Sequence, residues 1–183
     1  VFYRMVPLIR VLGCIAFTAK DQAAIEKPCT NPDATVHVYG KRWAWDFNYI
    51  NKDNPEDSVY YQGIQAQEEE NAKGAIDESQ LPTLYLPQGK KVAIELSSRD
   101  VDHSFWIIDF LYKKDMLPGK TNWEYFIPEK LGTYQGKCAE LCGEYHSLML
   151  FQVKVVTPAE YQKYLDSLEE QGKVGCGKFL GAL

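Results

Sequence analysis

The chain has 183 residues, a net charge of −5 and a hydrophobic content of 45%, as expected for one folded domain with a short appendage. This composition excludes a disordered chain, a collagen and a small disulfide-rich domain. The excess of 25 acidic over 20 basic residues argues against a nucleic-acid partner. Much of the negative charge falls within residues 62–82, which predicts a solvated acidic loop or a contact for a basic partner.

The first segment, residues 1–35, is predicted to be an apolar stub followed by a linker. Its apolar run, residues 5–19, is shorter than the ~20 residues of a membrane helix and contains Arg10. Three interpretations stay open, namely a buried helix, an interfacial helix, and the trailing end of a membrane helix. Pro28 and Pro32 predict a linker before the next domain.

Residues 36–157 are predicted to form an all-β barrel or sandwich, because apolar residues alternate along several short segments separated by turn signals. Each alternating set is expected to lie on one face of a half-buried strand. The sets are Trp43, Trp45, Phe47 and Tyr49; Val92, Ile94 and Leu96; Trp123, Tyr125 and Ile127; and Phe151, Val153 and Val155.

The last segment, residues 158–183, is predicted to be a short helix and a tail. Thr157 is a suitable N-cap, Pro158 suits the first helical position, and Glu160 completes a capping box. An apolar stripe of Tyr161, Tyr164, Leu165 and Leu168 predicts that the helix packs on the barrel and carries no chemistry.

The most informative stretch places two thiols, an imidazole and a thioether within 12 residues. Cys138, Cys142, His146 and Met149 have the spacing C-x3-C-x3-H-x2-M, and His103 lies upstream. These soft ligands favour copper. A mononuclear blue-copper site uses one Cys, two His and a weak axial Met. The second Cys therefore predicts two thiolate-bridged copper ions, each with one histidine and a weak axial ligand.

Such a site has no vacant position for a substrate, so it predicts electron transfer without bond chemistry. Two alternatives stay open. A structural zinc site of Cys138, Cys142, His103 and His146 leaves Met149 unexplained, and a Cys138–Cys142 disulfide leaves both histidines unexplained. The five cysteines cannot all pair within one chain. No role is predicted for the other three cysteines, which are Cys14, Cys29 and Cys176.

Four segments resemble one known family. Residues 138–143 with His146 and Met149 are similar to the binuclear copper (CuA) loop of cytochrome c oxidase subunit II. Residues 100–106 resemble the first-histidine segment of that family, residues 40–45 its tryptophan-rich strand, and residues 118–122 the loop before its copper motif. The similarity covers residues 36–157, in the order that the family shows.

The resemblance implies a cupredoxin-like Greek-key β-barrel on the extracytoplasmic face of a membrane. It implies that two copper ions are held by His103, Cys138, Cys142, His146, Met149 and the backbone carbonyl of Glu140. The Glu140 side chain would reach a magnesium ion shared with subunit I. Trp43 would be the entry point for electrons.

The implied function is that of the electron-entry subunit of a haem–copper terminal oxidase. Electrons would pass from a soluble or membrane-bound cytochrome c to the copper pair and then to haem a of subunit I, where O₂ is reduced to water and protons are pumped. The implied partners are subunit I, other oxidase subunits, cytochrome c and the membrane.

Two other functions remain as alternatives. The copper domain of nitrous oxide reductase shares this type of loop, and a binding module stabilised by zinc or a disulfide would have no redox role. The chain also departs from the family pattern. Lys41 and Arg42 stand where the family more usually has His-Gln, and they place positive charge at the entry point.

Overall fold

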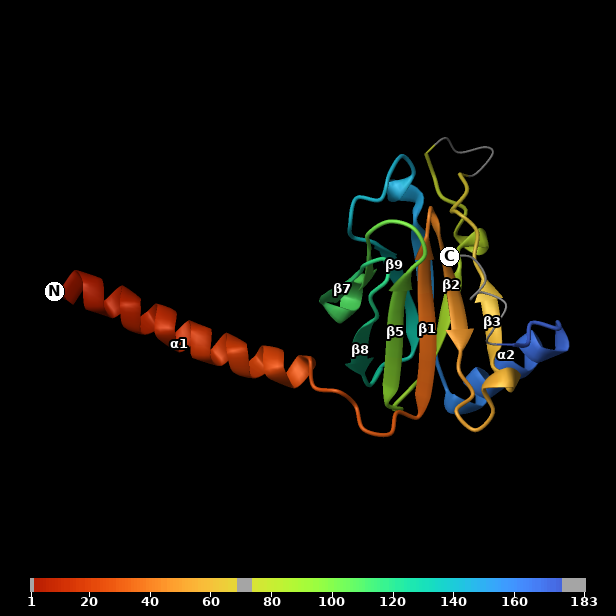
Figure 1. Cartoon of the computed structure of the whole chain (residues 1–183), viewed down its shortest axis with the longest axis horizontal. Coiled ribbons are helices and arrows are strands. Elements are labelled where there is room, and N and C mark those ends of the chain that lie inside the picture. The colour runs from red at the N-terminus through yellow and green to blue at the C-terminus, as the bar shows by residue number, and fades with distance from the viewer. Residues whose placement is uncertain (1, 69–73, 176–183) are drawn as a thin grey trace.

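The computed structural model describes residues 2–68 and 74–175 (Figure 1). Helix α1 (Phe2–Ile25) leads through a linker into a β-domain, and helix α2 (Pro158–Glu170) follows that domain. The strands are β1 (Ala34–Lys41), β2 (Ala44–Tyr49), β3 (Val59–Gln62), β4 (Thr83–Pro87), β5 (Val92–Ser98), β6 (His103–Ile107), β7 (Tyr112–Met116), β8 (Asn122–Phe126), β9 (Gly132–Cys138) and β10 (Leu150–Val156). Residues 69–73 of the predicted acidic segment, and residues 176–183 of the predicted tail, lie outside the described residues.

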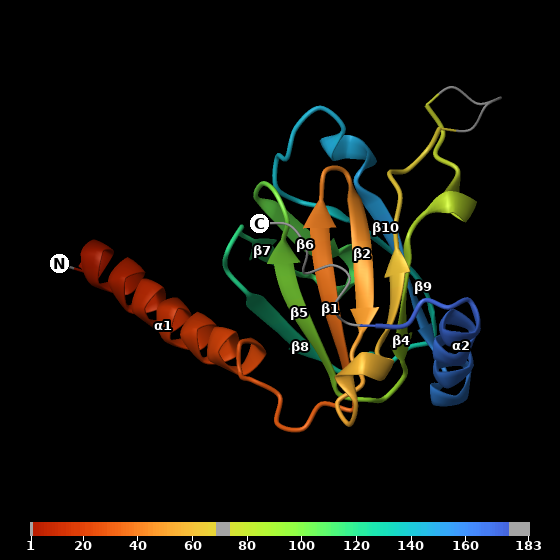
Figure 2. The same cartoon turned by 45° about the vertical axis from the view of Figure 1, so that its right-hand side comes forward.

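The strands form two five-stranded sheets, ordered β3-β2-β1-β5-β8 and β4-β10-β9-β6-β7. In Figure 2 the first sheet lies in front of the second. Large aromatic side chains of both sheets meet between them, and the Phe105 and Phe151 rings stack with their centroids 4.9 Å apart. The structure confirms the predicted all-β, cupredoxin-like architecture. The alternating residues of β5 and β10 lie in this core, as predicted.

The prediction for Trp43 was wrong in one respect. Trp45, Phe47 and Tyr49 are buried in β2, but Trp43 precedes this strand. The register pairs Lys41 with Ala44, so Arg42 and Trp43 form the two-residue connection of the β1–β2 hairpin. Trp43 therefore lies outside the strand alternation, and it packs against the core as a partly buried side chain.

The prediction for residues 123–127 was also wrong. In β8 the buried residue is Glu124, whereas Trp123 is 37% exposed and Ile127 lies beyond the strand and is also exposed. Glu124 pairs with Ile94, and residues paired across strands share one face of a sheet. Glu124 therefore faces the interior, and the aromatic residues beside it face outward.

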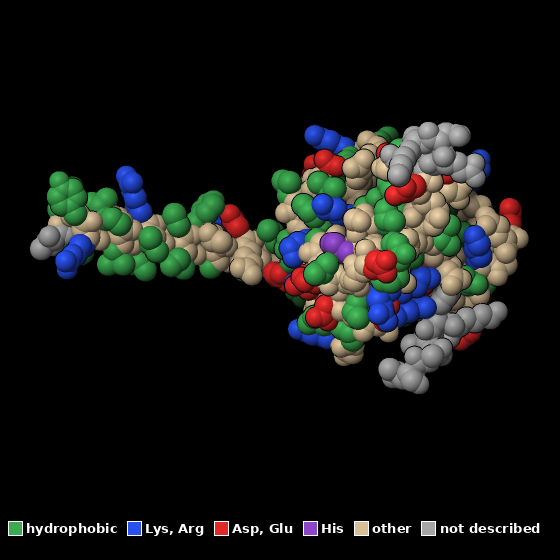
Figure 3. Space-filling view, turned by 90° about the horizontal axis from the view of Figure 1, so that it is seen from above, with side chains coloured by type: hydrophobic (Ala, Val, Ile, Leu, Met, Phe, Trp, Pro, Cys, Tyr) green, Lys and Arg blue, Asp and Glu red, His purple; other side chains and the backbone are tan. Residues whose placement is uncertain are grey.

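Helix α1 has no buried residue, which makes the interpretation as a buried helix wrong. It continues well past the apolar run of residues 5–19. Its length and composition are sufficient to cross a membrane. Figure 3 shows hydrophobic side chains exposed along the helix. No other described part of the chain buries them.

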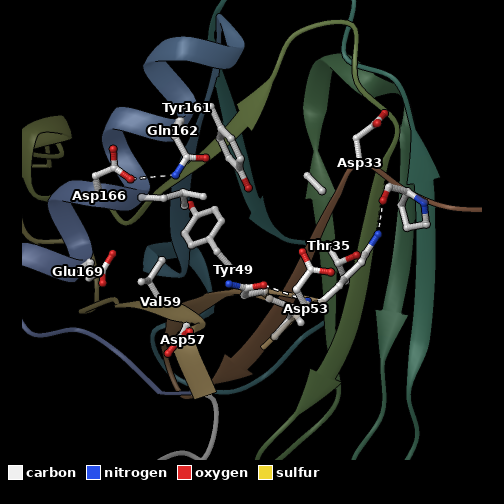
Figure 4. A pocket seen from close by; sticks show the side chains of 16 residues that line it. Asp33, Thr35, Tyr49, Asp53, Asp57, Val59, Tyr161, Gln162, Asp166 and Glu169 are labelled. Atoms are coloured by element: carbon white, nitrogen blue, oxygen red, sulfur yellow. Dashed lines mark hydrogen bonds between the residues drawn. The ribbon is translucent and has the colours of Figure 1, made fainter. Parts of the chain in front are cut away.

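Helix α2 confirms the predicted capping box. The Thr157 side chain accepts a hydrogen bond from the Glu160 backbone, and the Glu160 side chain bonds back to Thr157. Leu168 is buried, and Tyr161 and Tyr164 pack against the core. Between α2 and the start of β1 lies a cavity of about 590 Å³ (Figure 4). Its acidic lining residues are Asp33, Asp53, Asp57, Asp166 and Glu169.

Candidate metal centre

Strand pairing brings the two separated parts of the candidate site together. His103 opens β6 and Cys138 closes β9, and these strands run antiparallel with Phe105 opposite Cys138. The remaining donors lie on the loop from β9 to β10, where His146 begins a 3₁₀ turn and Met149 directly follows that turn. The loop therefore returns its end to its beginning, and the Cys138 N–H donates to the Met149 carbonyl at 3.0 Å.

The predicted donor atoms converge on the two thiols. The Sγ atoms of Cys138 and Cys142 are 3.9 Å apart, and both cysteines are free, so the disulfide interpretation does not hold. His103 Nδ1 lies 3.8 Å from Cys138 Sγ, and His146 Nδ1 lies 3.5 Å from Cys142 Sγ. His103, Cys138 and Cys142 are buried, with donor atoms within 4.8 Å of one another.

Two weaker donors complete the arrangement. The Met149 Sδ atom lies 3.7 Å from Cys142 Sγ, and the Glu140 carbonyl oxygen lies 3.2 Å from Cys138 Sγ. Each thiol is thus accompanied by one imidazole and one weak donor. Glu140 itself is exposed.

Two tryptophans, one in the β1–β2 connection and one on β2 of the opposite sheet, hold the loop in place. Trp45 donates from Nε1 to the Met149 carbonyl, and Trp43 donates from Nε1 to the Cys142 carbonyl, each at 3.2 Å. Gly143 has a φ of +123° and lies against the Trp43 ring, where a Cβ would approach to 3.2 Å. These contacts fix the backbone at both the second thiol and the thioether.

The surroundings shift the two thiols in opposite directions. Burial raises the pKa of Cys138, but hydrogen bonds with His103 and the backbone outweigh burial, and the net pKa is lowered. Burial, and then the adjacent Cys138, raise the pKa of Cys142 to about 12. The surroundings therefore favour the Cys138 thiolate over the Cys142 thiolate, and a metal, which deprotonates a coordinating thiol, would supply the positive charge that Cys142 lacks.

Asp100 is a site residue that the sequence analysis missed. Its Oδ1 lies 2.8 Å from His103 Nε2, and its carboxylate also accepts the backbone N–H groups of Arg42 and Val101. A carboxylate on the distal nitrogen fixes the tautomer and orientation of a ligating imidazole. The signal was the i,i+3 spacing of Asp100 and His103. Gly40 admits the ring, because a Cβ there would lie 2.9 Å from His103 Cδ2.

Comparisons with known proteins agree with this geometry. Residues 34–156 match the family model described as cytochrome c oxidase subunit II, periplasmic domain. The chain is 43% identical to a probable cytochrome c oxidase subunit 2 of Streptomyces avermitilis, over 94% of this chain and 60% of that relative. A subunit of the same description in Streptomyces coelicolor is also 43% identical, with the same coverage.

A solved structure shares the fold. The periplasmic domain of subunit II of cytochrome oxidase from Bradyrhizobium japonicum superposes with a TM-score of 0.65 and 25% identity, covering 78% of this chain and 97% of that one. The present chain spans about 60% of the length of the curated relatives it matches. On the family match and these similarities, the chain belongs to the cytochrome c oxidase subunit II family.

Proposed function

We propose that this chain is the electron-entry subunit of a haem–copper terminal oxidase and that it holds two copper ions. The observation that carries the proposal is the pair of free, buried thiols 3.9 Å apart, each with its own imidazole nitrogen within 3.8 Å. The ligands would be His103, Cys138, Cys142, His146, Met149 and the Glu140 carbonyl.

The donor set fits copper better than zinc. A structural zinc site is closed by four ligands, whereas a thioether and a carbonyl also converge here. Thiolate, imidazole and thioether are the ligands of copper electron-transfer sites. When bound, the two ions would supply a one-electron redox couple. The protein would contribute a buried pocket and fixed donors, and it offers no open position for a substrate.

Trp43 supports the proposed route of electron entry. Its indole bonds to the Cys142 carbonyl and meets the Tyr145 ring edge-on, with centroids 4.9 Å apart. Tyr145 is 39% exposed and Leu141 is 78% exposed, so the metal loop presents an aromatic and apolar surface outside Trp43. Cytochrome c would dock on this surface and deliver its electron through Trp43.

The remaining proposed partners are inferred from helix α1 and from the exposed side of the metal loop. Helix α1 would cross the membrane and hold the β-domain on the extracytoplasmic face. The exposed Glu140 side chain would bind magnesium at the boundary with subunit I. That subunit would receive the electrons at haem a, reduce O₂ to water and pump protons.

The test is metal content with electron paramagnetic resonance (EPR) on the copper-loaded chain. About two copper ions per chain and a signal delocalised over both are expected, since two thiolates bridge two ions. Cys138→Ser and Cys142→Ser should each abolish that signal. Cys29→Ser, which changes a thiol outside the cluster, is the matched control. One zinc per chain, or a two-copper signal that survives loss of either thiol, would contradict the assignment.

A second measurement tests the entry route. Trp43→Phe should slow reduction by cytochrome c while the two-copper spectrum is retained, because the change removes the indole but none of the proposed donor atoms, and Trp45 and Cys138 still bond the loop at the Met149 carbonyl. Trp123→Phe, on the outer face of β8, is the matched control. Equal reduction rates in the two variants would show that Trp43 only packs against the loop.

A further inference from the structure

A cluster of charged and polar groups joins the end of α1 to the barrel. Glu26 directly follows α1, and its Oε2 and Oε1 atoms lie 2.7 and 2.9 Å from Lys114 Nζ on β7. The Tyr112 hydroxyl, on the same strand, donates to Oε1. The hydrogen bond from Lys114, followed by that from Tyr112, lowers the pKa of Glu26, so the carboxylate is ionised and paired at neutral pH.

The cluster lies at an opening of the sandwich. The end of α1, the turn before β7 and strand β8 enclose a cavity of about 360 Å³ there. Glu26, Tyr112 and Glu124 line it together with apolar and aromatic side chains. The end of α1 and the residues that directly follow it therefore form one wall of this cavity, opposite residues of β7 and β8.

Glu124 lies inside this cavity as a carboxyl group without a hydrogen-bond partner for Oε1 in the described part of the chain. It is only 6% exposed. Burial raises its pKa to about 8, although the Lys114 charge acts in the opposite direction. Glu124 is therefore neutral at neutral pH, and it does not compete with Glu26 for the Lys114 ammonium.

The strand that receives Glu26 is bonded to the strand that carries a candidate metal ligand. In the antiparallel β6–β7 pair, Lys114 lies opposite Phe105 and Met116 lies opposite His103. A contact made at Lys114 therefore acts on the same hairpin as His103. Helix α1 has no buried residue of its own, so this contact is a direct restraint on how the helix end meets the barrel.

We propose that Glu26, Tyr112 and Lys114 form a junction latch, which fixes the orientation of the barrel relative to α1. Through that orientation, the three residues act as positioning residues for electron transfer to the next redox centre. The electron-transfer part rests on the proposed function, whereas the orientation part does not. Because electron transfer slows steeply with distance, a barrel that tilts on its linker transfers electrons more slowly. An ion-pair network as exposed as this one changes the ratio of correctly oriented to tilted barrels by up to about fivefold.

The experiment uses the whole oxidase in lipid nanodiscs. Nitroxides on p-acetylphenylalanine introduced at Lys20 in α1 and at Lys130 beyond β8 report the helix–barrel distance by double electron–electron resonance. Lys114→Met should broaden the distance distribution and slow electron transfer from the copper pair to haem a by up to about fivefold, with the copper EPR signal unchanged. Lys114→Arg should restore both readouts.

Two further variants make the result decisive. Glu26→Gln removes the same ion pair from the linker side without altering the barrel, and it should reproduce the broadening. Lys113→Met changes the neighbouring lysine, which pairs with Asp115 at 3.3 Å on the other face of β7, and should leave the distribution narrow. Distributions as narrow as the wild type in both Lys114→Met and Glu26→Gln overturn the latch. Loss of the two-copper signal in the wild type would instead overturn the proposed function.

Discussion

Glu124 allows a quantitative prediction, because a buried carboxyl group makes stability depend on pH. In the folded chain its pKa is about 8, against an ordinary value of 4.5, and the main cause is burial. Between these two values the unfolded carboxyl has lost its proton and the folded one retains it. Folding then takes up a proton, so the free energy of unfolding falls as pH rises through this interval.

Glu124→Gln removes this dependence, because an amide of similar shape does not titrate. A pKa difference of one unit corresponds to about 1.4 kcal/mol. The free energy of unfolding of the variant should therefore rise relative to that of the wild type by about 1 kcal/mol for each pH unit between pH 5 and 7.5, or roughly 2–3 kcal/mol over that interval. Above pH 8 the difference should level off, since Glu124 is then ionised in both states.

The assay is urea unfolding of the purified chain in mild detergent, followed by circular dichroism of the β-domain at several pH values. Other groups that titrate in this range, such as His37 with a pKa lowered to about 4 mainly by burial, contribute equally to both proteins and cancel in the difference. Glu129→Gln, an exposed acid in the following loop, is the control and should track the wild type. A stability difference that stays constant from pH 5.5 to 7.5 would refute the reasoning.

Three further substitutions have definite expected outcomes. Met149→Leu should shift the reduction potential of the copper-loaded chain with little loss of copper, because a thioether is a weak axial ligand; an unchanged potential in voltammetry would make Met149 a packing residue only. Gly136→Ala should cost ~1–3 kcal/mol of unfolding free energy, because its Cβ would lie 2.2 Å from the Phe151 ring. Thr157→Ala should cost ~1 kcal/mol through loss of the N-cap, and urea unfolding measures both losses.

The sequence predicted those elements whose signals are local. The capping box of Thr157 and Glu160 is complete within four residues, and it starts α2 in the structure. Strands β5 and β10 were predicted because each has an apolar face that the core fully buries. The end of α1 was missed because the length of the apolar run was used as the guide. Backbone hydrogen bonding continues the helix through charged residues such as Lys20 and Asp21.

The prediction for β8 failed for a different reason. Alternation defines two faces of a strand, but it does not say which of them faces the core. Trp123 and Tyr125 stack on each other on the outer face, with centroids 6.0 Å apart. Their large apolar surface suggested burial, and the position of β8 at the edge of its sheet left that surface uncovered. Glu124 then took the inner position, where it lines the same cavity as Glu26.

The candidate donors were predictable to different degrees because of where they lie in the chain. Cys138, Cys142, His146 and Met149 share one loop, and their spacing alone suggested a common site. His103 was included as the second histidine that the donor count needs, and its contact with Cys138 spans 35 residues and depends on the β6–β9 pairing. Asp100 was missed because a carboxylate three residues from a histidine is common, and only the fold turns it toward Nε2.

The way the donors are held bears on how the site would work as a redox centre. The Met149 carbonyl is bonded by Trp45 and by the Cys138 N–H, and the Cys142 carbonyl is bonded by Trp43. These bonds involve backbone groups and indoles, and none of them uses a metal-binding atom. The loop would therefore keep these hydrogen bonds in both oxidation states of a bound metal. Donor atoms that stay in place when the metal gains or loses an electron suit a one-electron carrier. Asp100 likewise holds the His103 ring without using its donor atom, because Asp100 bonds Nε2, the nitrogen that faces away from the thiols.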